Sequence, residues 1–229
     1  MKKVAILQSN YIPWKGYFDL IAAVDEFIIY DDMQFTKNDW RNRNIIKTPK
    51  GCEWISVPVG QDIRRRIRDV ELPNKPWQNK HWKTLEMNYT RAAHFEEIAQ
   101  IFGPIYLQRQ FTHLSELNRV FIEKVCNYLG ITTKISCSWD YKLIVGRTER
   151  IVDLCVQAGC TEYVSGPAAK NYIVDPLFTE SGIKLKWFDY GDYPEYPQLW
   201  GEFAHGVTIL DLLFNCGNKA PQYMKFGYL

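Results

Sequence analysis

The stretch VAILQSNYIPWKGYFDLIAAVDEFIIYDD, residues 4–32, carries the strongest information about the fold. Its two apolar runs, 4–7 and 27–30, have the continuous hydrophobic character of strands that are covered on both faces. Residues 17–24 lie between them and predict a short helix. A strand, a helix and a second strand in about thirty residues make a βαβ unit, which generates a parallel sheet.

The remainder of the chain supplies further elements of both kinds. Residues 33–52 are polar, rich in Asn, Lys and Arg, and predict a loop. The other expected elements are a strand over 53–59, mostly helical structure over 79–129, a helix over 150–157, strands over 161–164 and 183–188, and a helix over 208–214. We therefore expect one α/β domain spanning 1–229, with three layers, a mainly parallel Rossmann-like sheet and a mostly helical insertion at about 79–130.

Composition narrows the function classes. The chain has 229 residues, and its net charge of +2 does not indicate a nucleic-acid partner. Aromatic residues make up 15%, including eight Trp and fourteen Tyr. Such residues pack a bulky core or line a pocket that combines apolar faces with polar groups, and both interpretations stay open.

The sequence also bears on location and on metal binding. No apolar run is long enough for a membrane span or a signal peptide, so we expect a cytoplasmic protein. The six Cys form no Cys-x-x-Cys pair and the four His lack ligand spacing, so no metal site is expected. The cofactor is left unspecified, and a homo-oligomer is left open.

Candidate binding residues lie in the first loop, because parallel sheets bind ligands beyond the carboxyl ends of their strands. Lys15 and Gly16 stand at the entrance of the predicted helix, where an anion would be favoured. The alternative is that Pro13 and Gly16 only shape a turn. The candidates in this loop are Gln8, Asn10, Tyr11, Trp14, Lys15, Gly16 and Tyr17.

Two further loops follow strand ends. The acidic pair Asp31 and Asp32 could act as a general base or hold Mg²⁺, although only one of two adjacent residues should face a pocket. Arginine forks suit phosphates and carboxylates, and the loop after 165 offers backbone N–H groups and a cation to an anion. A polar surface loop and a simple turn explain both segments equally well. The candidates are Asp31, Asp32, Gln34, Arg41, Arg43, Ser165, Gly166 and Lys170.

His205 is the histidine in the most suggestive setting, because it follows a tyrosine-rich segment that contains Tyr196. A lone histidine is more often structural. If it is catalytic, its imidazole suits proton transfer near neutral pH. The catalytic candidates are therefore His205, Asp32 and Lys15, with Tyr196 as a further binding residue.

The opening segment through Asp39-Trp-Arg-Asn-Arg-Asn44, together with residues 163–170 and 187–206, resembles the WbqC-like family. That resemblance implies a role in bacterial surface-polysaccharide biosynthesis, including O-antigen clusters, with no reaction assigned. The opening is also similar to nucleotidyltransferase-type folds, which include pantothenate synthetase. Their His-x-Gly-His signature is replaced here by Trp14-Lys15-Gly16-Tyr17, which argues against ordinary adenylyl transfer.

Three hypotheses about function follow. The leading one is a transferase that moves an acyl or aminoacyl group to the amine of a nucleotide-linked amino sugar. His205 or Asp32 would then accept the amine proton, while Lys15, Arg41 and Lys170 would hold anionic groups. The second hypothesis is an ATP-dependent, adenylate-forming ligase of the pantothenate synthetase type. The third is a non-catalytic binding protein of the same pathway.

Overall fold

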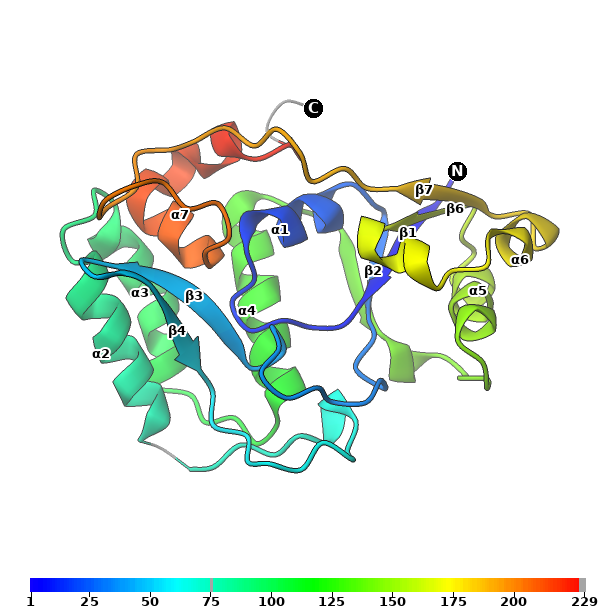
Figure 1. Ribbon diagram of the computed structural model, residues 1–229, viewed down its shortest axis with the longest axis horizontal. Coiled ribbons are helices and arrows are strands. Elements are labelled where there is room, and N and C mark those ends of the chain that lie inside the picture. The colour runs from blue at the N-terminus through cyan, green and yellow to red at the C-terminus, as the bar shows by residue number, and fades with distance from the viewer. Residues whose placement is uncertain (75, 227–229) are drawn as a thin grey trace.

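The computed structural model describes residues 1–74 and 76–226, and within these residues five parallel strands form the central sheet (Figure 1). The strand order is β5-β2-β1-β6-β7. The strands are β1 (Lys3–Leu7), β2 (Glu26–Ile29), β5 (Lys134–Cys137), β6 (Glu162–Ser165) and β7 (Lys184–Trp187). The predicted α/β class with a parallel sheet is confirmed.

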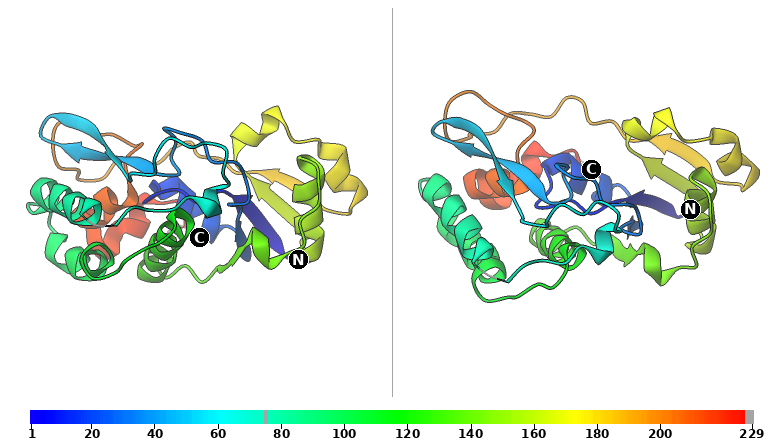
Figure 2. Two further views of the ribbon diagram at one scale, coloured as in Figure 1. Left: turned by 90° about the horizontal axis from the view of Figure 1, so that it is seen from below. Right: turned by 60° about the horizontal axis from the view of Figure 1, so that its bottom comes forward.

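The two faces of the sheet pack into two separate hydrophobic clusters. Val4 and Ile28 point into one cluster, and Ala5 and Phe27 point into the other, because successive side chains of a strand face opposite sides. The first cluster is covered by α5 (Thr148–Gln157) and α6 (Asp175–Glu180). The second is covered by α1 (Lys15–Ala22), α4 (Leu114–Leu129) and α7 (Ile209–Cys216). These layers make the three-layer arrangement that the sequence predicts (Figure 2).

Two more helices and a hairpin lie at the end of the molecule away from β6 and β7 (Figure 1). The helices are α2 (Trp77–Tyr89) and α3 (Phe95–Leu107), inside the region predicted to be mostly helical. The hairpin joins β3 (Arg43–Thr48) to β4 (Gly51–Ser56). The prediction of a loop throughout 33–52 is wrong for β3. Ile46 and Ile55 bury one face of the hairpin. The buried polar residues of β3 are compatible with a strand because they have partners: Asn44 donates to the Tyr11 and Ile12 carbonyls, and Lys47 donates to Gln198.

Other local differences from the sequence prediction are small. Helix α1 begins at Lys15, two residues earlier than the pattern indicates. Strand β5 and helix α6 were not predicted, because the sequence KISC of β5 has no continuous apolar run and the six residues of α6 are too few to establish a helical period. Within the described residues, no helix is both long and apolar enough to cross a membrane.

The strand order contains one reversal, and it determines where a ligand crevice forms. From β1 the chain builds outward through β2 and β5, and then returns to place β6 and β7 on the other side of β1. The carboxyl ends of β1, at Leu7, and of β6, at Ser165, are therefore neighbours at the reversal point. In open parallel sheets this is the usual position of a ligand site.

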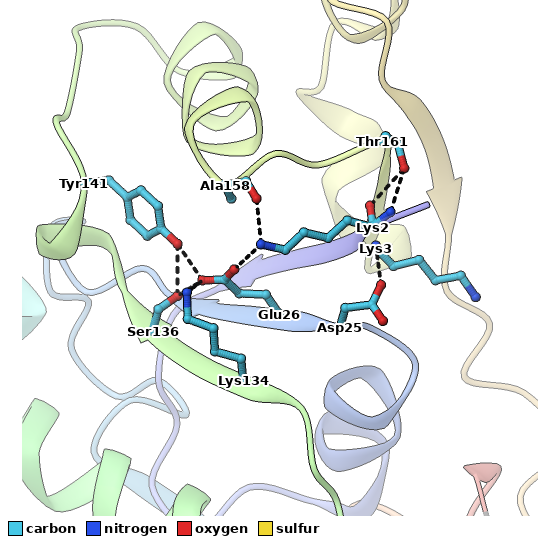
Figure 3. A network of polar contacts seen from close by, with 9 residues as sticks. All are labelled: Lys2, Lys3, Asp25, Glu26, Lys134, Ser136, Tyr141, Ala158 and Thr161. Carbon is cyan, nitrogen blue, oxygen red and sulfur yellow. Dashed lines mark hydrogen bonds and ion pairs between the residues drawn. The ribbon is translucent and has the colours of Figure 1, made fainter.

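At the opposite, amino-terminal edge of the sheet, Glu26 collects a network of polar partners (Figure 3). Lys2 Nζ lies 2.7 Å and Lys134 Nζ 2.9 Å from its carboxylate, and the Ser136 hydroxyl donates to it at 2.6 Å. Tyr141 donates as well. Burial raises the pKa of Glu26, but these partners outweigh burial and lower it to about 2. The network joins β1, β2 and β5 at this edge.

Candidate functional site

A cavity of about 290 Å³ lies beyond the carboxyl end of β1, and we name it the tryptophan cavity. Three segments that are far apart in the sequence form its wall: the β1–α1 loop, the start of β3 and the residues before α7. Its lining residues are Asn10, Trp14, Trp40, Asn44, His205 and Gly206. Two indoles, two amides and one imidazole around a small enclosure can stack on a ring and hydrogen-bond to its substituents.

The β1–α1 loop that supplies Asn10 and Trp14 is held in an unusual backbone conformation. Ile12 has a φ of 38°, which is costly for a β-branched residue because its side chain clashes with the backbone there. The Ile12 carbonyl accepts hydrogen bonds from Asn44 Nδ2 at 2.9 Å and from Thr208 Oγ1 at 2.8 Å. Two other wall segments therefore stabilise the strained residue. Strain of this kind concentrates at functional sites.

Trp14 is positioned by the first turn of α1 and by the crossing segment, residues 188–208, which runs from β7 to α7 (Figure 1). A Cβ atom at Gly16 would lie 2.4 Å from the Trp14 ring, so only glycine lets the indole fold over this turn. The indole also contacts Tyr190 and Tyr193, each with ring centroids 5.5 Å away. Gly16 thus serves the cavity by placing Trp14.

Arg41 links Gln8 and Asn10 through one guanidinium group. Its Nη2 donates to Gln8 Oε1 at 2.8 Å, and its Nη1 donates to Asn10 Oδ1. With Oδ1 engaged, the Asn10 amide keeps its Nδ2 as a further donor. The structure thus brings together Gln8, Asn10 and Arg41, three of the predicted site residues from two different loops.

His205 lies exposed at the cavity wall, on the last part of the crossing segment. Its ring contacts Phe203 edge-on, with centroids 4.6 Å apart, and Phe203 in turn contacts Tyr196. The Tyr196 hydroxyl donates to the buried carboxylate of Asp211 at 2.6 Å. A buried polar anchor therefore supports the aromatic contacts that orient this imidazole.

Lys15 is buried and lies outside the residues that line the tryptophan cavity. Its Nζ donates to the Pro194 carbonyl at 3.0 Å and lies 4.9 Å from the ring centroid of Tyr193. Burial lowers its pKa to about 8, with Asp19 acting in the opposite direction. These contacts tether the crossing segment to α1.

Asp31 and Asp32 are occupied by protein groups. Asp31 accepts hydrogen bonds from Ser9 N at 2.8 Å and from Ser9 Oγ at 2.6 Å, and burial raises its pKa while the serine hydrogen bonds lower it. Asp32 accepts from Ser138 Oγ at 2.7 Å and pairs with Arg68 at 3.1 Å. Neither is among the residues that line the tryptophan cavity. Both hold loops in place.

Several other predicted site residues do not line the tryptophan cavity. Tyr11 is fully buried, and its hydroxyl contacts His81 Nδ1 at 2.9 Å and the Tyr106 hydroxyl at 2.7 Å. Arg43 stacks on the exposed ring of Trp54, 4.0 Å from its centroid. The other predicted residues lie outside the cavity wall: Tyr17 donates to the Gln8 carbonyl, Gln34 donates to the Ile63 carbonyl, Ser165 ends β6, Gly166 faces Tyr190 and Lys170 lies over Trp187.

Apart from Gly206, which adjoins His205, two wall residues, Trp40 and Asn44, were not among the predicted site residues. Both lie in the polar segment before and within β3, which lacks a visible period. The Tyr11 N–H donates to the Trp40 carbonyl at 2.9 Å, and Asn44 Nδ2 also donates to the Tyr11 carbonyl at 3.0 Å. Only the tertiary structure places this segment against the β1–α1 loop.

Comparisons with known proteins agree on the relationship of this chain. It is 57% identical over 228 residues to the uncharacterized protein Rv1507c of Mycobacterium tuberculosis, covering 99% of each chain. No solved structure matches. The model of the WbqC-like protein family matches residues 8–223. The chain therefore belongs to the WbqC-like family, as its opening motif indicates, and this membership suggests a role in a polysaccharide-associated pathway.

Proposed function

We propose that the protein is a transferase that moves an acyl or aminoacyl group to the amine of a nucleotide-linked amino sugar. The observation that carries the proposal is the composition of the tryptophan cavity. Indole faces pack on the C–H faces of a sugar ring, while the Asn10 amide can donate to one of its hydroxyl groups. Its volume of about 290 Å³ suits one sugar ring and is too small for a whole nucleotide sugar.

His205 is the group in this wall that can accept a proton. In the proposed reaction the sugar amine attacks the carbonyl carbon of an activated acyl donor and forms a C–N bond. The bond between that carbon and its carrier breaks, and the amine proton passes through His205 to the leaving carrier. Asp32 is a weaker candidate for this base, because Ser138, Arg66 and Arg68 already engage its carboxylate.

The remaining predicted residues support the site indirectly under this proposal. Lys15 holds the crossing segment, which carries His205, through its bond to the Pro194 carbonyl. Arg41 orients Asn10 through its bond to Asn10 Oδ1, and the same guanidinium also binds Gln8. Lys170 is exposed and lies over Trp187, so it is the least suited of the anion-binding candidates.

The test is a search for an N-acylated product. The purified chain is incubated with a panel of nucleotide-linked amino sugars and with acyl thioesters and aminoacyl donors, and product mass is followed. Trp40→Ala should raise KM by about tenfold through lost stacking. Absence of product across the panel, with no nucleotide-sugar binding by calorimetry, would contradict the proposal. Product that forms only with ATP and a free carboxylate would indicate the ligase instead.

A further inference from the structure

A second cavity, of about 490 Å³, lies on the other side of Gln8, at the point where the strand order reverses. We name it the arginine cavity. Its wall includes Gln8 at the end of β1, Tyr30 after β2, Gly146, Arg147 and Arg150 at the start of α5, and Tyr172 after β6. It is therefore built where parallel sheets bind ligands and is larger than the tryptophan cavity.

The charge of this cavity favours an anion. Its wall contains two arginines and, among the residues that the structure describes, no carboxylate. Neither guanidinium forms an ion pair within residues 1–74 and 76–226. Arg150 donates through Nε to the Ile144 carbonyl at 2.6 Å, and its side chain also hydrogen-bonds to Tyr30. These contacts fix the guanidinium at the cavity wall. Paired guanidinium groups of this kind suit phosphate oxygens.

The same wall offers a surface for a flat ring. The Arg147 guanidinium lies 4.1 Å from the centroid of the Tyr172 ring, which is 37% exposed. Stacked arginine and tyrosine groups present a planar face on which a nucleobase can pack. Gly146 has a φ of 118°, and a Cβ atom there would lie 2.7 Å from Glu149 Oε2, so the turn that delivers Arg147 requires glycine.

The walls of the two cavities are linked through the side chain of Arg41. Gln8 lines the arginine cavity and Asn10 lines the tryptophan cavity. The Arg41 guanidinium binds the side-chain carbonyls of both residues. Arg41 therefore fixes the wall residues of the two cavities relative to each other.

We propose that the arginine cavity binds the nucleoside diphosphate part of the substrate, with Arg147 and Arg150 on the phosphates and Tyr172 beside the base. This inference rests on the proposed function for the identity of the ligand, and it assigns the nucleotide to a place separate from the sugar. The tryptophan cavity then determines which sugar is accepted, and the arginine cavity determines which nucleotide carries it.

Calorimetry on the full chain tests this assignment with the 5′-diphosphates of uridine, thymidine, guanosine, cytidine and adenosine, and with inorganic pyrophosphate. We expect at least one nucleoside diphosphate to bind, and more tightly than pyrophosphate. Arg150→Met should weaken that binding by about tenfold to hundredfold, as expected for a charged hydrogen-bonding group. Arg147→Met serves as a second variant, because its side chain is exposed and its loss should leave the fold intact.

Arg91→Met is the matched control, since it removes the same charge from an exposed arginine that contacts Trp200. It should leave nucleotide affinity unchanged, and so should Trp40→Ala in the other cavity. Absence of binding by all five nucleotides, or wild-type affinity in both Arg147→Met and Arg150→Met, would overturn the assignment.

The outcomes also separate this inference from the proposed function. Arginine-dependent nucleotide binding without any N-acylated product would support the nucleotide site and contradict the transferase. Product formation with an unchanged KM in Arg150→Met would support the transferase and overturn the nucleotide site.

Discussion

At the amino-terminal edge of the sheet, every oxygen of the buried Glu26 carboxylate meets a donor, from Lys2, Lys134, Ser136 or Tyr141 (Figure 3). At the carboxyl-terminal edge, Arg147 and Arg150 line a cavity without an ion-pair partner in the described part of the chain. Matched polar groups stabilise a fold, whereas unmatched groups in a cavity remain available to a ligand. The contrast predicts that substitutions at the two edges affect different properties.

The carboxyl-terminal edge also contains the strained residue, Ile12. The strained backbone of Ile12 lowers the free energy of unfolding. Because proteins are only marginally stable, favourable interactions elsewhere in the fold have to offset this loss. We therefore expect the Glu26 network to contribute stability to the whole sheet. The loop around Ile12 contributes the geometry of the cavity.

The largest expected effect is on catalysis. His205→Gln should lower kcat by about a hundredfold or more, the usual contribution of a positioned general base. The melting temperature should stay at the wild-type value, because the side chain is exposed. His94→Gln is the control, since His94 is half-buried, pairs with Glu97 and lies outside the residues that line the tryptophan cavity. Equal activity in the two variants would remove His205 from the mechanism.

Substitution at the amino-terminal edge should lower stability and leave ligand binding unchanged. Glu26→Gln should lower the free energy of unfolding by about 3 kcal/mol, as loss of one partner from a buried ionic group does, with nucleotide affinity unchanged. Urea unfolding and calorimetry on the same samples measure both. A weaker ligand affinity with wild-type stability would break the contrast between the edges.

The same network sets an acid limit on stability. The folded pKa of Glu26, about 2, lies below its ordinary value of 4.5. The unfolded chain therefore binds a proton first as the pH falls, so this contribution is complete above pH 4.5 and is lost as the pH falls through about 2. Glu26→Gln should lack this part of the decline, which urea midpoints at successive pH values would measure.

An intermediate effect, on both stability and sugar binding, is expected at Thr208. Thr208→Val removes the hydroxyl that donates to the Ile12 carbonyl at 2.8 Å. We expect a loss of about 1 kcal/mol in stability, together with weaker sugar binding as Trp14 and Asn10 lose their positions. Thr84→Val is the control, because its hydroxyl bonds only within α2, to the Lys80 carbonyl at 2.8 Å. Unchanged sugar affinity in Thr208→Val would show that the strained conformation persists without this bond.

The smallest effect concerns Lys15, whose folded pKa of about 8 lies below its ordinary value of 10.5. Stability should therefore rise as the pH increases through this window, because the unfolded chain holds the proton longer. Lys15→Met lacks the buried charge and should be more stable at pH 7 by about 1 kcal/mol, despite losing its bond to the Pro194 carbonyl. The gain should disappear above pH 10.5. A constant difference across the window would mean that Lys15 is not titrating there.

Much of the central sheet is predictable because its signals are local. The runs that became β1 and β2 are continuous in hydrophobicity, which predicts strands that are covered on both faces. Of the residues that the strand-end rule selected, Gln8, Asn10 and Trp14 line cavities in the structure, and their role in binding stays a prediction. Strand β3 of the hairpin was missed because its polar residues hide its period, whereas β4 overlaps the strand predicted over 53–59.

The sequence by itself determined the fold class, the βαβ opening and the family, because apolar periodicity and a specific motif are properties of short segments. The tertiary structure alone decided which side chains share a cavity. Trp40, Asn44 and His205 reach the β1–α1 loop through hydrogen bonds to Tyr11 and Ile12 and through the crossing segment, contacts between residues up to 196 positions apart. It also buried Lys15 and left Arg150 facing a cavity, since desolvation and charge pairing depend on neighbours that no local pattern specifies.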